Sequence, residues 1–314
     1  MAVDVQEPRS ARARTAVAGA RAATEARFGP GDRRDRIESL AFVGILVIGV
    51  GAALLGLIGI IAWAAIEGRP LLTTRLITEG PSTIDIVGAG YRPAIIGTVY
   101  LILGVVLLIV PVGVGAAVYL EEFADKTKWW NRLIELNIQN LAGVPSIVFG
   151  ILGLGFIARG PLSLGFVAAA GSLTLALLVL PTVILASREA VKSVPPSIRE
   201  GSLALGVTPW QTVRRQVLPA AFPGILTGVI LAVSRAIGET APLLLVGAAT
   251  FVTFDPDFFS SRYSALPVQI FTYAGRPQDD FRVLAAAGVI LMLAVVLLMN
   301  SVAIFLRSRY EDRT

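Results

Sequence analysis

The chain has 314 residues, of which 55% are hydrophobic and 16% charged, and its mean hydropathy is +0.74. A soluble domain of this length would not bury so much apolar surface, so we predict an integral membrane protein surrounded by membrane lipid. The absence of cysteine and histidine excludes thiol or imidazole catalysis, disulfide bonds and the usual zinc sites. We assign the net charge of +5 to residues flanking apolar spans, not to a nucleic-acid partner.

Six apolar runs reach the length of about 20 residues that a helix needs to cross a bilayer. Five carry no charge, and the fifth in chain order contains Arg235 and Glu239. Lipid cannot satisfy backbone polar groups, so each run is predicted to be one helix. A tight turn at Gly160 and Pro161 is expected between the third and fourth helices. The runs are residues 40–66, 93–120, 136–158, 160–187, 220–249 and 283–306.

Lysine and arginine are unevenly distributed between alternate connections. Nineteen lie in the two termini and in the second-to-third and fourth-to-fifth connections, whereas the other three connections carry seven. By the positive-inside rule, both termini and the fourth-to-fifth connection, residues 188–219, are predicted to face the cytoplasm.

These patterns divide the chain. Residues 1–38 are rich in alanine and arginine without a sustained apolar stripe, which predicts a disordered basic cytoplasmic tail. An uncleaved first transmembrane helix at 39–66 is expected next, followed by a periplasmic segment at 67–92. Residues 93–306 are predicted to form a core of five transmembrane helices, and residues 307–314 a second cytoplasmic tail.

The 188–219 connection carries signals for two short helices joined at a glycine. After a proline pair, Ser197 followed by Glu200 has the spacing of a capping box. Gly206 is suited to end the first helix, and Thr208, followed by proline, is suited to start the second. By spacing alone, the segment is either such a helical hairpin or an ordinary interfacial linker.

The same segment resembles the EAA loop of ATP-binding cassette (ABC) importer permeases with the MetI-like fold. Glu200, Gly206, Leu218 and Pro219 fall at the spacing of that motif, although its two alanines are Gly-Ser here and an isoleucine is glutamine. In that family the loop is the coupling helix that seats in a groove of the ATPase subunit. The resemblance therefore implies that these four residues couple the chain to an ATPase.

Longer strings narrow the resemblance to the phosphate-specific permeases of this family, over roughly residues 94–309. It implies an all-α protein with six transmembrane helices and a MetI-like type I importer fold, in the bacterial inner membrane. The implied partners are a sister permease subunit, a dimer of ATPase subunits and an extracytoplasmic phosphate-binding protein. The strings are NLAGVPSIVFG (140–150), LALGVTPWQTVRRQVLPAAFPGILTGVIL (203–231), SRAIGETAPLL (234–244) and ALPVQIF (265–271).

Arg235 lies at the middle of the fifth apolar run, where inserting an arginine costs roughly 2.5 to 3.5 kcal/mol. Glu239, four residues on, is expected on the same helix face about one turn closer to the outside, where the two can pair. The pair either fixes helix packing or forms a transient anion site, because a guanidinium offers paired donors to phosphate oxygens. With Thr240 of the same string, these residues are the predicted substrate path.

Other polar residues carry open alternatives. Arg159, at a short external turn, is either a second phosphate contact or simply solvated. Glu121 and Glu122 either add contacts to a partner or sit at the membrane interface. Asn300 is expected to join two helices by a hydrogen bond.

None of the three lysines follows a glycine, as a P-loop requires, so no nucleotide site, cofactor or metal is expected and the chain itself is not an enzyme. We therefore predict a permease subunit of an ATP-driven phosphate importer. The alternatives are a permease for molybdate or sulfate, a stand-alone channel or proton-coupled carrier, and a structural membrane scaffold.

Overall fold

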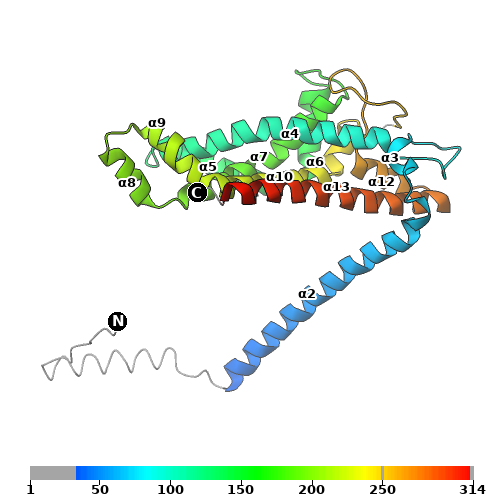
Figure 1. Ribbon diagram of the computed structural model, residues 1–314, viewed down its shortest axis with the longest axis horizontal. Helices are drawn as coiled ribbons and strands as arrows, with labels where there is room; N and C mark the ends of the chain where they lie inside the picture. Colours follow the sequence, from blue (N-terminus) through cyan, green and yellow to red (C-terminus); the bar gives the residue numbers. More distant parts are fainter. Residues whose placement is uncertain (1–32, 249–250, 312–314) are drawn as a thin grey trace, which may run out of the picture. The chain divides into compact units, whose positions relative to one another are not determined.

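A computed structural model describes residues 33–248 and 251–311 (Figure 1), and every regular element within those ranges is helical. The all-α prediction is therefore confirmed. Most of the predicted disordered tail, residue 249 of the fifth run and the last three residues lie outside the described residues. The chain divides after Ile61 into two units, and the packed helices belong to the second.

The first long helix, α2, covers Arg33–Gly68 and is long and apolar enough to cross a membrane. Its last residues belong to the second unit. There Glu67 accepts a hydrogen bond of 3.0 Å from Arg282, and Ala64 is fully buried.

Four long helices build the second unit: α4 (Arg92–Val118), α7 (Ala168–Lys192), α10 (Leu218–Gly238) and α13 (Asp279–Glu311). Helix α7 is central, packs against both α4 and α10, and is the most buried of the candidate spans. The shorter elements are η1 (Arg69–Leu71), α3 (Arg75–Thr78), η2 (Tyr119–Phe123), α5 (Trp129–Ala142), α6 (Ser146–Leu152), η3 (Gly153–Ala158), α8 (Pro196–Ala204), α9 (Pro209–Thr212), η4 (Val213–Val217), α11 (Ala241–Leu245) and α12 (Leu266–Ala274).

Small residues let α7 and α10 approach closely. Gly224 of α10 faces Ala190 of α7, and Gly228 faces Ala186. A Cβ atom added at Gly228 would lie 2.5 Å from the Cβ of Ala186. Helices in lipid gain little from hydrophobic exclusion, so this small-residue seam is a main source of their packing energy.

The third predicted span is not one straight helix. Helix α5 and the α6–η3 segment meet at an angle of 107°, across Gly143 and Pro145. Proline has no backbone N–H, so Pro145 cannot continue the hydrogen-bond ladder of the preceding helix. Among the described residues, five helices are long and apolar enough to cross a membrane, or six if this bent pair is one span. The connection after it is also longer than the expected tight turn, because α7 begins only at Ala168.

The fifth predicted span ends earlier and starts earlier than expected. Segments α9, η4 and α10 form one continuous helical stretch, so the second short helix of the 188–219 connection is the start of this span. The helix ends at Gly238, and Glu239 has extended backbone angles of φ −73° and ψ 121°. Helix α11 then starts with a proline in its first turn.

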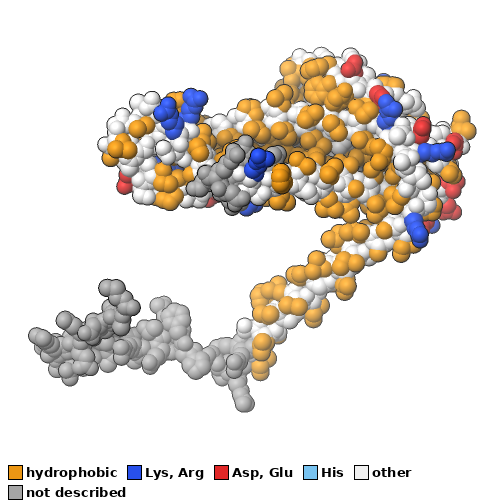
Figure 2. Space-filling model, in the orientation of Figure 1, with side chains coloured by type: hydrophobic (Ala, Val, Ile, Leu, Met, Phe, Trp, Pro, Cys, Tyr) orange, Lys and Arg blue, Asp and Glu red, His pale blue; other side chains and the backbone are white. Residues whose placement is uncertain are grey.

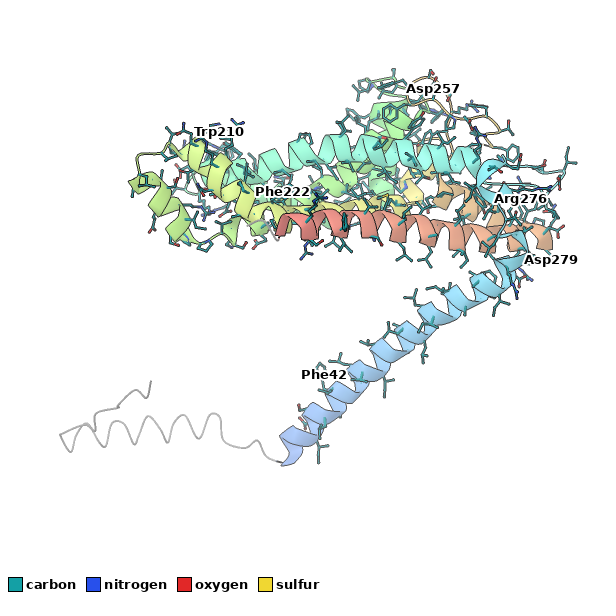
Figure 3. All side chains as sticks on the ribbon, viewed as in Figure 1. Phe42, Trp210, Phe222, Asp257, Arg276 and Asp279 are labelled. Carbon is teal, nitrogen blue, oxygen red and sulfur yellow. The ribbon has the colours of Figure 1, made fainter. Side chains whose placement is uncertain are left out.

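The second unit has two distinct ends. One carries α8 and α9, with Trp210 labelled there in Figure 3, and we call it the loop end. Arg276 and Asp279 lie at the opposite end (Figure 3). Hydrophobic side chains cover most of the visible bundle between them, and charged side chains gather mainly toward the ends (Figure 2). This distribution is typical of a membrane-spanning bundle.

Candidate functional site

Arg235 and Glu239 form the predicted ion pair, with 3.3 Å between the Arg235 Nε and Glu239 Oε1 atoms. The arginine side chain is 46% exposed and the glutamate side chain 16%. Arg235 lies in the last turn of α10, where a cation interacts favourably with the negative end of the helix dipole. The predicted pairing is confirmed, but the two residues do not share a continuous helix face, because the helix ends between them.

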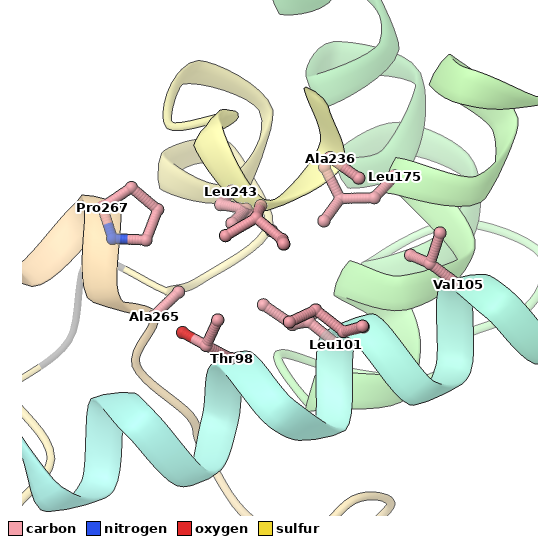
Figure 4. A pocket seen from close by; sticks show the side chains of 10 residues that line it. Thr98, Leu101, Val105, Leu175, Ala236, Leu243, Ala265 and Pro267 are labelled. Atoms are coloured by element: carbon pink, nitrogen blue, oxygen red, sulfur yellow. The ribbon is translucent and has the colours of Figure 1, made fainter. Parts of the chain in front are cut away.

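The end of α10 nevertheless lies deep in the bundle. Ala236 lines a cavity of about 10 Å³ together with Leu101 of α4 and Leu243 of α11 (Figure 4). Leu101 is nine residues from the start of α4, or about 14 Å at 1.5 Å per residue. Arg235, the neighbour of Ala236, therefore lies along the length of the helical bundle and not at either of its ends, although α10 stops there.

Thr240 and Asn300 have different surroundings. Thr240 follows Glu239 at the break and is half-buried, and its carbonyl accepts from the backbone N–H of Leu244 at 3.0 Å. Asn300 of α13 accepts a hydrogen bond of 2.6 Å from the hydroxyl of Ser234 on α10. The expectation that Asn300 joins two helices is therefore confirmed.

The four residues predicted to contact an ATPase are spread along the loop end. Glu200 is exposed on α8, and Gly206 forms the turn after it with φ +77°, a conformation that favours glycine. Leu218 and Pro219 begin α10, separated from Gly206 by α9 and η4. The four motif residues therefore lie one after another along a helix–turn–helix segment and do not form one cluster.

One capping prediction holds and one is wrong. Thr208 accepts a hydrogen bond from the Gln211 backbone, and the Gln211 side chain accepts one from the Thr208 backbone, so this box is complete. Ser197 and Glu200 form no such box. Helix α8 starts at Pro196, which places Ser197 inside its first turn and removes its hydroxyl from the capping position.

Sequence reasoning missed the ion pair between Glu122 and Arg199. Arg199 of α8 donates to Glu122 of η2 at 2.6 and 3.0 Å, and the side chain of Arg199 is only 22% exposed and that of Glu122 only 11%. The same guanidinium donates to the backbone carbonyls of Val194 and Val191 at 2.6 and 2.9 Å. The partners are 77 positions apart, so no local spacing signals the contact.

A second group of charges adjoins the first. Arg188, near the end of α7, donates to Glu135 of α5 at 2.8 Å and to Glu121 of η2 at 3.3 Å. Lys126 also pairs with Glu121 at 2.8 Å. Adjacent glutamates of one turn therefore hold different helices, and neither is a free interfacial charge. No cluster of three or more acidic side chains suited to a metal occurs in the part of the chain that the structure describes.

The second unit also carries an exposed arginine on an aromatic ring and an apolar groove. Arg159 is exposed and stacks over the ring of Phe166, with 5.1 Å from its Cζ atom to the ring centroid. A groove of about 630 Å³ lies between α4 and α10. Its lining is apolar except for an arginine: Val110, Pro111, Val114, Gly115, Arg214, Leu218, Pro219, Phe222, Pro223 and Ile225.

Comparisons with known proteins agree with this architecture. The sequence profile of the family described as "Binding-protein-dependent transport system inner membrane component" matches residues 109–313. The chain is 34% identical to the phosphate transport system permease protein PstA of Yersinia pestis, over 82% of this chain and 87% of that protein. It is 37% identical to PstA 1 of Mycobacterium tuberculosis (strain CDC 1551 / Oshkosh), covering 64% and 65%. The probable ABC transporter permease YqgI of Bacillus subtilis (strain 168) is 34% identical, covering 65% and 69%.

Solved structures share the fold at low identity. A chain of the inward-facing MetNI methionine ABC transporter superposes with a TM-score of 0.54 and 17% identity, covering 72% of this chain and 97% of that one. A chain of a bacterial alginate importer gives 0.58 and 14%, covering 88% and 96%. The predicted MetI-like permease fold is therefore confirmed. The chain belongs to the family of binding-protein-dependent transport system inner membrane components, which are multi-pass permease subunits of ABC importers.

Proposed function

We propose that this permease carries inorganic phosphate and that Arg235 is its contact with the anion inside the membrane. The observation that carries the proposal is the position of Arg235, half-exposed at the end of a broken helix inside the bundle. A guanidinium offers planar, paired donors to two oxygens of one phosphate. The relatives named as phosphate transport permeases support the choice among oxyanions.

Glu239 gives the site its reversibility. Its carboxylate already contacts Arg235 through a single hydrogen bond of 3.3 Å, which is weaker than a bidentate pair. An arriving phosphate competes with this carboxylate for the guanidinium. When phosphate leaves, Glu239 returns to its place, so the anion is contacted without being trapped. Thr240, adjacent to Glu239 at the break, adds a hydroxyl to the same path.

The energy source is a partner. An ATPase and a binding protein are implied by the family, and we propose that one subunit of an ATPase dimer seats the 188–219 connection around Glu200 and Gly206. A second permease subunit would complete the path on the exposed side of Arg235, and an extracytoplasmic phosphate-binding protein would deliver the anion. From the distribution of lysine and arginine, we propose that the loop end and both termini face the cytoplasm. Closure of the ATPase pair would then open the path inward.

The test is phosphate uptake in cells that lack the gene. Wild-type protein, Arg235→Gln and Arg235→Lys are expressed, with Arg159→Gln as the control, because Arg159 is also exposed but stacks on an aromatic ring. We expect uptake at low phosphate with the wild type and the control, less than a tenth of it with Arg235→Gln, and an intermediate value with lysine. Co-purification of the ATPase checks that each variant assembles.

Competing anions test the substrate. Sulfate or molybdate in hundredfold excess is expected to leave uptake unchanged. If either anion abolished phosphate uptake, that anion would be assigned as the substrate in place of phosphate, and the assignment of the permease fold would stand. Uptake by Arg235→Gln at the wild-type rate would show that the pair serves helix packing only.

A further inference from the structure

The turn at the end of α4 contacts both arms of the 188–219 connection. Glu122 of η2 pairs with Arg199 of α8 at 2.6 Å. The neighbouring Phe123 packs against Trp210 of α9, with 6.3 Å between ring centroids and 43° between ring planes. The η2 turn, which directly follows α4, is therefore held by a segment more than 70 positions further along the chain.

Arg199 is the centre of this connection. Besides Glu122, its guanidinium donates to the backbone carbonyls of Val191 in α7 and of Val194 just after it. One side chain thus ties α8 to the ends of both α4 and α7. Both charged side chains are largely shielded from solvent, so the charge-assisted hydrogen bonds between them are strong. Removal of one partner would leave the other charge shielded and uncompensated.

The connection to α10 is covalent. Helix α9 continues through η4 into α10 without a break, and the hydroxyls of Ser202 in α8 and Thr212 in α9 lie 3.0 Å apart. The two arms of the loop are therefore also joined to each other. A displacement of α8 has three routes into the bundle: the chain into α10, the Arg199 carbonyl contacts into α7 and the Glu122 pair into α4.

We propose that Glu122 and Arg199 are positioning residues for energy coupling, which make α4 follow the loop when a partner ATPase moves it. Of the three routes, the one into α4 depends most on a single ion pair, because its other contact is the tilted aromatic pair of Phe123 and Trp210. Breaking the ion pair removes the main contact of α8 with the end of α4, which stays packed against α7 through Glu121 and Arg188, so ATP hydrolysis continues while transport falls. The proposal uses the ATPase docking of the proposed function but does not depend on phosphate as the substrate.

Two measurements on the complete transporter test the proposal. The first compares ATP hydrolysis and phosphate uptake in the same proteoliposomes for wild type, Glu122→Ala, Arg199→Ala and the double variant. Lys126→Ala is the matched control, since Lys126 pairs with Glu121 beside the same turn. We expect uptake per ATP to fall at least tenfold in both single variants and in the control to stay within twofold of wild type. The double variant should be no worse than Arg199→Ala, which removes the pair together with the hydrogen bonds to the Val191 and Val194 carbonyls.

The second measurement needs no substrate. The chain has no cysteine, so spin labels at Ser197→Cys on α8 and Gly115→Cys on α4 report one distance. Both positions are exposed, and a Cβ atom at Gly115 meets no neighbour within 4 Å. In the wild type the distance distribution should stay the same with and without a trapped ATP analogue. In Glu122→Ala it should shift or broaden when the analogue is bound.

The outcomes separate this proposal from the proposed function. If the wild-type complex takes up no phosphate but the distance between the two spin labels changes only in Glu122→Ala, the assignment of phosphate as substrate is wrong and the coupling role stands. Unchanged uptake per ATP in both single variants would overturn the coupling role. A wild-type label distance that changes by several ångströms on ATP binding would overturn it as well, because α4 would then not follow the loop.

Discussion

The close contact between Gly228 of α10 and Ala186 of α7 allows a quantitative test of the packing that holds α10 in place. In Gly228→Ala, the new methyl group lies 2.5 Å from the Cβ atom of Ala186, about 0.9 Å short of the 3.4 Å at which ordinary contact begins. Overpacking of this kind costs about 1 to 3 kcal/mol. The substitution also gains about 1 kcal/mol of intrinsic helix propensity, so its total effect alone is not informative.

The control removes that ambiguity. Gly115→Ala on α4 gains the same propensity, and its methyl group meets no neighbour within 4 Å. The difference between the two variants therefore isolates the contact, and we expect Gly228→Ala to be less stable than Gly115→Ala by about 1 to 3 kcal/mol. The assay is reversible unfolding in mixed detergent micelles, followed by circular dichroism.

A second substitution checks the identity of the contact. In an Ala186→Gly background the opposing methyl group is gone, so adding Gly228→Ala should no longer destabilise the protein. The coupling between the two sites should equal the overpacking cost. The reasoning is refuted if Gly228→Ala unfolds at the same detergent fraction as Gly115→Ala, because the helices would then not be in close contact.

Two smaller effects follow from polar contacts. Asn300→Ala removes one of two acceptors of the Ser234 hydroxyl and leaves the Ile230 carbonyl as the other, so it should destabilise the protein by about 0.6 kcal/mol in the same unfolding assay, with uptake kept above half of wild type. Hydrogen bonds from Thr127 lower the pKa of Asp125 below its usual range. This stabilisation is present above the unfolded pKa and is lost as the pH falls through the lower, folded pKa. The melting temperature of Asp125→Asn should therefore be below wild type at pH 6 and approach it toward pH 3.

The apolar runs predicted the number and approximate positions of the membrane helices, because the requirement for about 20 apolar residues is set by the bilayer. They did not predict continuity within a run. The apolar run resumes at Leu243, so it extends past the break after α10, and the short, less apolar stretch from Gly238 to Pro242 did not divide it. The signal that was present is conformational: Gly238 can end a helix, and Pro242 cannot continue one. The same combination marks the bend between α5 and α6.

Long-range charge pairs were beyond sequence reasoning for a different reason. The pairing of Arg235 with Glu239 was predictable because four residues separate them. Glu122 and Arg199 meet only after α4, α7 and the intervening helices have packed. The sequence carries no local signal for the role of Arg199, because a basic residue in a loop of this kind is usually solvated. Its role is visible only from the two carbonyl groups and the glutamate that surround it.

The segments that follow the two helix breaks pack against each other. Backbone groups freed by a break inside the hydrocarbon core are tolerated only where protein or water covers them. Helix α6, which follows the first break, packs against α11, which follows the second, and a Cβ atom at Gly150 would lie 2.7 Å from the Cα atom of Pro242. The break after α10 is thus covered by protein on the α6 side. Arg235 remains half-exposed beside it, and an arginine at this depth is stable only if water or another subunit faces it. The proposed anion path therefore requires that the exposed side of Arg235 faces water or a second subunit and not lipid.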